Sequence, residues 1–232
     1  MSDIAPTIVA CPRCGAEQSA TVFRSLNGDV VEAQRIAILD GRFECRACAR
    51  CEFEFRPEHE LLYTQASARA WIVMYPQVER ARFATLERAV ESVLERELAA
   101  APPVAATALR GLRPRLVFGQ HMLAEAVRTI EAGLDPSLLE CAKLLAVRRS
   151  LASFLPLGPF ELCFERIDND GAIACGVHTL ADGERRGELA LLPDAVAEAR
   201  ENQADLEARF PDLFQRPYVS MTRVLYSDHA LT

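Results

Sequence analysis

The chain has 232 residues, half of them hydrophobic, which is enough for a buried core and excludes wholesale disorder. Its net charge of −7 argues against broad, charge-driven binding to nucleic acid. Lys143 is the only lysine, and the arginine-rich composition is typical of a high-GC bacterial genome. We place a domain boundary near Gln77, which gives one domain over residues 1–77 and a second over 78–232.

The first nine residues lack the basic segment and the long apolar run of a secretory signal. No stretch approaches the length of apolar sequence that a membrane span needs. We therefore expect a cytoplasmic protein whose thiols stay reduced. In that compartment the eight cysteines indicate metal ligands and buried thiols rather than disulfides.

The first domain is predicted to consist of short strands around one short helix. Alternating or β-rich sequence predicts strands over residues 20–23, 43–44, 52–55 and 70–75. Helical spacing over 30–39 stops at Asp40-Gly41.

The second domain begins with a predicted amphipathic helix over residues 79–98. Its apolar face comprises Phe83, Leu86, Val90, Val93 or Leu94, and Leu98, with Glu87 on the charged face. A proline- and alanine-rich connector follows over 99–114. A helical block over 118–154 is broken at Asp135-Pro136, with Asp135 as the N-cap of the second helix.

The C-terminal part is predicted to return to strands, over residues 160–167, 172–179, 187–192 and 218–226. A tight turn at Asp170-Gly171 joins the first two and would place Cys163 opposite His178 and Cys175 opposite Arg166. A helix beginning near Asp194 directs four apolar residues inward: Val196, Ala199, Leu206 and Phe210.

Two close-set cysteine clusters are the clearest functional signal. Cys11 and Cys14 flank a turn that Pro12 restricts, and Gly15 permits the left-handed step after it. A second cluster holds three cysteines at steps of three: Cys45, Cys48 and Cys51. Such spacing is typical of four thiolates around one tetrahedral Zn²⁺, and we expect one structural zinc ion.

The second cluster leaves the fourth ligand open. Cys45 with Cys48, or Cys48 with Cys51, completes a four-cysteine site, and neither pair is followed by glycine. The remaining thiol is a spectator, an exchange ligand or a redox partner. Three arginines partly offset the charge of a four-thiolate site: Arg13, Arg46 and Arg50. The alternatives are ordinary reduced thiols, thiol–disulfide chemistry and an iron–sulfur cluster.

The N-terminal part resembles the CpXC domain, a family of uncharacterised bacterial and archaeal proteins. The resemblance rests on CPRCGAE at residues 11–17, the strand after it, the second cysteine knuckle, Leu61-Leu62-Tyr63, and the strand 71–75 before Pro76. Segments 117–119 and 131–135 are also similar. The distance from the knuckle to Leu61 favours Cys48 with Cys51, whereas the lead-in at Phe43 favours Cys45 with Cys48. The resemblance implies a zinc-ribbon-like fold and no activity.

The remaining candidate residues are expected to have structural roles and not functional ones. His59 is an alternative ligand, but we expect a surface histidine. His121 and Glu125 share a helix face and are expected at a solvated helix start. Three further cysteines are expected as small buried hydrophobic residues: Cys141, Cys163 and Cys175.

We therefore predict an α+β fold, with a zinc-ribbon-like β unit, a helical segment and a small antiparallel sheet with a packed helix. The leading functional hypothesis is a zinc-stabilised, non-enzymatic interaction or regulatory protein. Helix 79–98 is a candidate partner or dimerisation face, and the alternative, which we favour, is that this helix docks on its own domain. Nucleic-acid binding through the ribbon is disfavoured, because residues 1–75 carry eight arginines against ten acidic residues. A thiol oxidoreductase that uses Cys45, Cys48 and Cys51 is the third hypothesis.

Overall fold

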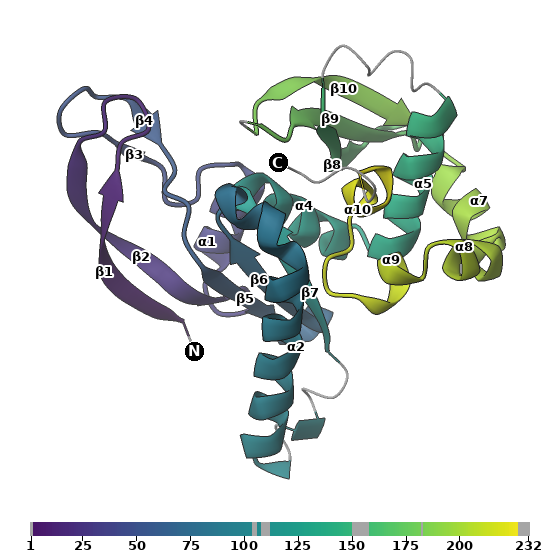
Figure 1. The fold of residues 1–232 in the computed structure, drawn as a ribbon, viewed down its shortest axis with the longest axis horizontal. Helices are drawn as coiled ribbons and strands as arrows, with labels where there is room; N and C mark the ends of the chain where they lie inside the picture. The colour runs from purple at the N-terminus through teal and green to yellow at the C-terminus, as the bar shows by residue number, and fades with distance from the viewer. Residues whose placement is uncertain (1, 104–105, 108–111, 150–157, 182, 227–232) are drawn as a thin grey trace. The chain divides into compact units, whose positions relative to one another are not determined.

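The computed structural model describes residues 2–103, 106–107, 112–149, 158–181 and 183–226. They form two compact units, one from Met1–Arg80 with Val90–Ala124 and one from Ala81–Ala89 with Glu125–Thr232. The fold is mixed α and β, as predicted, with N-terminal strands, helices and a small antiparallel sheet (Figure 1). The first switch between the units lies close to Gln77, but the chain returns to the first unit after residue 89.

The first unit is built on a five-stranded sheet in the order β1-β2-β5-β6-β7. Neighbours are antiparallel except β2 with β5 and β6 with β7, which are parallel. The strands are β1 (Asp3–Ala10), β2 (Glu17–Asn27), β5 (Leu61–Gln65), β6 (Ala70–Tyr75) and β7 (Arg113–Phe118).

Two smaller elements complete the N-terminal part of this unit. Helix α1 (Glu32–Leu39) follows β2 and stops at Asp40-Gly41, as predicted, and Gly41 takes the left-handed conformation. Strands β3 (Arg46–Ala47) and β4 (Glu54–Phe55) pair with each other at one end of the β1–β2 hairpin (Figure 1).

The connection from β6 onward contains the long helix of the molecule. A 3₁₀ segment (Gln77–Arg82) leads into α2 (Phe83–Ala100), and a short 3₁₀ turn (Ala66–Ala68) joins β5 to β6. Leu86, Val90 and Leu94 are buried as predicted. Glu87, which we predicted on the charged face, is buried as well, because its carboxylate accepts a hydrogen bond from the Tyr218 N–H and pairs with Arg223 at 2.5 Å.

The second unit packs helices on a three-stranded antiparallel sheet in the order β10-β9-β8. Helix α4 (Gly119–Glu131) enters it, and α5 (Pro136–Arg149) lies in its core. Asp135 caps α5 as predicted, since its carboxylate accepts hydrogen bonds from the N–H groups of Ser137 and Leu138. Residues 150–154 of the predicted helical block lie outside the described residues.

The sheet of the second unit confirms the predicted strands but not their register. Its strands are β8 (Phe160–Ile167), β9 (Ile173–Thr179) and β10 (Arg185–Leu191). Cys163 lies opposite Gly176 and Cys175 opposite Phe164, because the turn is wider than two residues and a bulge lies between Phe164 and Arg166. Both cysteines are buried, as is Cys141.

The C-terminal helices close this core. They are α7 (Ala195–Glu201), α8 (Gln203–Arg209), α9 (Pro211–Gln215) and α10 (Met221–Leu225). The four apolar residues predicted to face inward after Asp194 are buried. The strand predicted over 218–226 was wrong: Ser220 caps a helix there by accepting a hydrogen bond from the Thr222 N–H.

The core of the second unit contains a buried charge cluster around the only lysine. Lys143 Nζ forms ion pairs with Glu125 and Glu140, and all three side chains are buried. The two carboxylates also accept hydrogen bonds from the backbone N–H groups of Phe164 and Met221. Glu125, predicted at a solvated helix start, is therefore part of the core.

Candidate metal centre

Four thiols meet where the β1–β2 hairpin approaches the β3–β4 pair. The Sγ atoms of Cys11, Cys14, Cys48 and Cys51 all lie within 4.8 Å of one another. Cys11 lies 3.7 Å from Cys51, and Cys14 lies 3.7 Å from Cys48. Four ligands at the usual zinc–sulfur distance of about 2.3 Å in a tetrahedron are about 3.8 Å apart. The cluster therefore has the size of a four-thiolate metal site.

The first knuckle is a tight turn that follows β1. The Cys11 N–H donates to the carbonyl of Ala16, and the Gly15 N–H donates to the carbonyl of Cys11, both at 2.9 Å. Gly15 has a φ of 68°, the left-handed conformation that the sequence predicts for it. This turn directs the thiols of Cys11 and Cys14 toward the same point.

The second knuckle repeats this hydrogen-bond pattern. The Cys48 N–H donates to the carbonyl of Phe53, and the Glu52 N–H donates to the carbonyl of Cys48, both at 2.9 Å. Glu52 takes the place of the glycine, with a φ of 58°. Cys48 and Cys51 are therefore the structural counterparts of Cys11 and Cys14.

The structure separates Cys45 from the other predicted ligands. Its side chain is exposed and is not part of the four-thiol group. Residues 43–44, which we predicted as a strand, form a turn, and Glu44 has a φ of 53°. Because β3 begins only at Arg46, the residue that enters the knuckle from this strand is Cys48.

His59 is also outside the thiol group, and it is not a surface residue. Its Nε2 lies 2.9 Å from the carbonyl oxygen of Phe23, and its Nδ1 lies 3.5 Å from the carboxylate of Glu44. Glu44 in turn accepts a hydrogen bond from the Phe23 N–H. Burial raises the pKa of Glu44. The side chains of His59 and Glu44 thus both bind the backbone of Phe23 in β2.

Backbone N–H groups stabilise negative charge on the second knuckle. Those of Arg50 and Cys51 lower the pKa of Cys48 to about 6, and the Arg50 N–H lies 3.4 Å from the Cys48 Sγ. The Phe53 N–H lowers the pKa of Cys51, but burial and the neighbouring thiols outweigh it and raise that pKa to about 12. Adjacent thiols oppose one another's ionisation in this way until a cation balances their charge.

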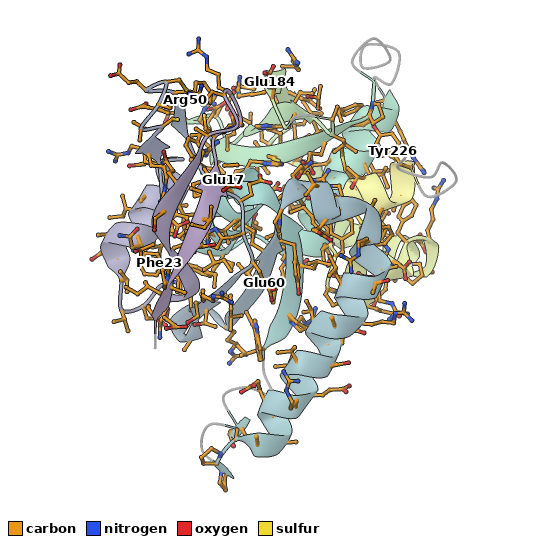
Figure 2. The ribbon with its side chains drawn as sticks, turned by 60° about the vertical axis from the view of Figure 1, so that its left-hand side comes forward. Glu17, Phe23, Arg50, Glu60, Glu184 and Tyr226 are labelled. Carbon is orange, nitrogen blue, oxygen red and sulfur yellow. The ribbon has the colours of Figure 1, made fainter. Side chains whose placement is uncertain are left out.

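The neighbouring side chains position the knuckles rather than add ligands. Gln18 accepts a hydrogen bond from the Ala49 N–H and so joins β2 to the second knuckle. The guanidinium group of Arg46 donates to the carbonyls of Thr21 and Glu44, and that of Arg13 stacks over Phe53 at 5.8 Å. Figure 2 shows Arg50 and Glu17 near the knuckle end of the hairpin, with Phe23 farther along β2.

Two of the four thiols are buried in a small core, and the other two are partly exposed. Cys11 and Cys48 are buried with Phe55, whereas Cys14 and Cys51 are partly exposed. Since four protein thiols fill a tetrahedral coordination shell, the arrangement can hold a metal ion but presents no open position for a substrate.

Comparisons with known proteins agree with this geometry. The family model described as "CpXC protein" matches residues 9–143, which include all four clustered cysteines. No curated protein and no solved structure matches the chain. No helix among the described residues is long and apolar enough to cross a membrane. Since the match covers more than half of its length, the chain belongs to the CpXC family.

Proposed function

We propose that this chain is a zinc-stabilised, non-enzymatic interaction or regulatory protein, in which Cys11, Cys14, Cys48 and Cys51 hold one structural zinc ion. The observation that carries the proposal is the pair of matched knuckles, which brings four Sγ atoms within 4.8 Å of one another. Thiolate-only donor sets favour zinc or an iron–sulfur centre over magnesium and calcium.

A structural role follows from the size of the unit around the site. The core at the thiols contains only three buried residues besides their partly buried neighbours, namely Cys11, Cys48 and Phe55. Such a core contributes little to folding, whereas zinc binding by four cysteines contributes on the order of 10 kcal/mol. The metal ion therefore holds the β3–β4 pair against the hairpin.

The proposal is tested by metal content and thiol titration on the untagged protein. We expect one zinc per chain and four protected thiols that become reactive after chelation. Cys51→Ser should lose most of its zinc, because one of four ligands is removed, whereas Cys45→Ser should keep the wild-type content. Chelation should also lower the thermal stability of the wild type by several degrees.

Several outcomes would contradict the proposal. Full zinc content in Cys51→Ser with loss in Cys45→Ser would reassign the fourth ligand. Iron in place of zinc would show that the site holds iron and not the proposed zinc ion. Metal-free protein with reactive thiols that form a mixed disulfide under mild oxidant would favour the oxidoreductase hypothesis instead.

The interaction role is supported by an exposed apolar face on the edge strand of the first unit. Ile4 and Ile8 on β1 are 57% and 64% exposed, and Pro6 between them is exposed as well. Pro6 lacks an N–H, so it disfavours pairing of a further strand with the edge of β1. A partner would therefore contact the side chains of Ile4, Pro6 and Ile8 instead of the backbone. We propose that a second copy of this chain docks on this face.

Sedimentation velocity over a range of concentrations tests self-association through this face. We expect Ile4→Thr with Ile8→Thr to weaken any self-association of the wild type. A wild type that stays monomeric throughout would overturn this docking proposal.

A further inference from the structure

A cavity in the first unit lies outside the cysteine site. Its volume is ≈ 620 Å³, which is within the range of cavities that bind drug-sized molecules. Its walls are mostly apolar and include Leu62, Trp71, Val93 and Leu112. None of the lining residues belongs to the thiol group.

The sheet register explains why these residues share one wall. Asn27 lies opposite Thr64 in the β2–β5 pair, and Thr64 lies opposite Trp71 in the β5–β6 pair. Residues opposite each other in neighbouring strands point to the same face, and Leu62 joins them because side chains alternate along β5. Helix α2 supplies the facing wall with Val93 and Glu97, which are four residues apart and therefore on one side of the helix.

Two opposite charges lie in the cavity lining. Arg69, in the turn between β5 and β6, has a left-handed backbone, and Glu97 lies near the end of α2. Within the described residues neither side chain forms an ion pair with the other or with a third group. An apolar cavity with one cationic and one anionic group is complementary to a ligand that carries both charges.

The indole of Trp71 belongs to the same wall. Trp71 is 4% exposed, and its Nε1 has no hydrogen-bond acceptor among the described residues. That nitrogen is covered by surrounding protein atoms, so Trp71 contributes apolar ring surface to the cavity.

We infer that this cavity binds a small apolar zwitterion, such as an amino acid with a large apolar side chain. Its carboxylate lies against Arg69, its ammonium group against Glu97, and its apolar part against Leu62, Trp71 and Val93. The inference is independent of the metal ion and goes beyond the interaction role.

The chain carries its own reporter for this site, because Trp71 is its only tryptophan. Bromine quenches tryptophan fluorescence on contact, so para-bromophenylalanine is a suitable probe. Two matched compounds each lack one charge: bromophenethylamine has no carboxylate, and bromophenylpropanoate has no ammonium group. Fluorescence of the full chain is titrated with all three.

We expect saturable quenching by the zwitterion, with an affinity at least tenfold higher than for either matched compound. Arg69→Asn should remove the advantage over the amine, since asparagine tolerates the left-handed backbone but lacks the charge. Glu97→Gln should remove the advantage over the acid. Arg24→Gln, an exposed arginine on β2 outside the cavity, should bind as the wild type does.

The result that overturns the inference is quenching that does not saturate, or that is equal for the three compounds. Tight binding of only the acid or only the amine would also overturn it, by assigning one charge instead of two. Because these variants alter side chains at the surface or cavity rim, unchanged circular dichroism identifies a loss of binding that is not a loss of fold.

Discussion

At the residue scale, the second knuckle shows how a site can form without the residue that its turn favours. Gly15 and Glu52 have the same role in the two knuckles, with φ angles of 68° and 58°. A side chain in the left-handed region costs about 1–2 kcal/mol, which glycine avoids. The strain at Glu52 is tolerated because the Cys48 turn and its hydrogen bonds require this conformation.

Glu52→Gly should therefore stabilise the protein by about 1 kcal/mol, because the gain at φ exceeds the entropy cost of glycine in the unfolded chain. The substitution also removes a negative carboxylate beside the negative thiolates, which should add to the stabilisation. Urea unfolding with zinc bound measures the change. Glu54→Gly, two residues away in β4, is the matched control and should destabilise instead; a loss of stability in Glu52→Gly would show that the side chain has a role of its own.

A second prediction at this scale concerns the buried thiol of Cys141. Burial raises its pKa to about 12, with smaller contributions from Glu140 and Asp135. Between the unfolded value near 9 and this value, the folded state keeps a proton that the unfolded state has lost, so stability falls as pH rises, by up to about 1.4 kcal/mol per pH unit.

Cys141→Ala removes this dependence and suits the helix, although it costs some packing at every pH. From about pH 8 to about pH 10 the wild type should lose about 1.5 kcal/mol more than the variant does in urea unfolding. Parallel losses in the two proteins would show that this thiol titrates alike in the folded and unfolded chain.

At the element scale, the buried charge cluster joins four elements of the second unit. Lys143 and Glu140 belong to α5 and Glu125 to α4, while the carboxylates bind N–H groups at Phe164 in β8 and Met221 in α10. Burial lowers the pKa of Lys143, but the two carboxylates outweigh it and raise that pKa. The lysine is therefore charged, and it is the cation that makes two buried carboxylates tolerable.

Lys143→Met should cost about 3–5 kcal/mol, because it leaves two buried carboxylates without their cation. Urea unfolding measures the loss. Adding Glu125→Gln and Glu140→Gln to this variant should restore part of the stability, since no buried charge then remains. A single variant as stable as the wild type would mean that the cluster is hydrated or rearranges freely.

The sequence predicted most elements that carry a strong local signal. Strand β6 and strand β8 have their predicted bounds, and Asp135 caps α5. Strands β1, β5 and β7 were missed; β1 and β7 each contain a proline, which weakens the local signal for a strand. The run at 218–226 alternates like a strand but is helical because Ser220 caps it and the core buries Met221 and Thr222.

At the scale of the whole molecule, the chain departs from a simple order of domains. Residues 81–89 group with the C-terminal part, and residues 90–124 return to the N-terminal part. Parallel pairing of β7 with β6 explains the return, since parallel neighbours require a long crossover, which here contains α2. Composition and periodicity carry no signal for such a crossover.

The sequence by itself determined the α+β class, the family and the presence of a four-cysteine site, because cysteine spacing and periodicity are local properties of the chain. Only the tertiary structure decided that Cys48 and Cys51 complete the thiol group, since the choice depends on where β3 ends and on a left-handed glutamate. It also brought Glu125 to Lys143, and Leu62 and Trp71 to Val93. These groupings join residues far apart in the chain, and packing, not local sequence preference, places them together.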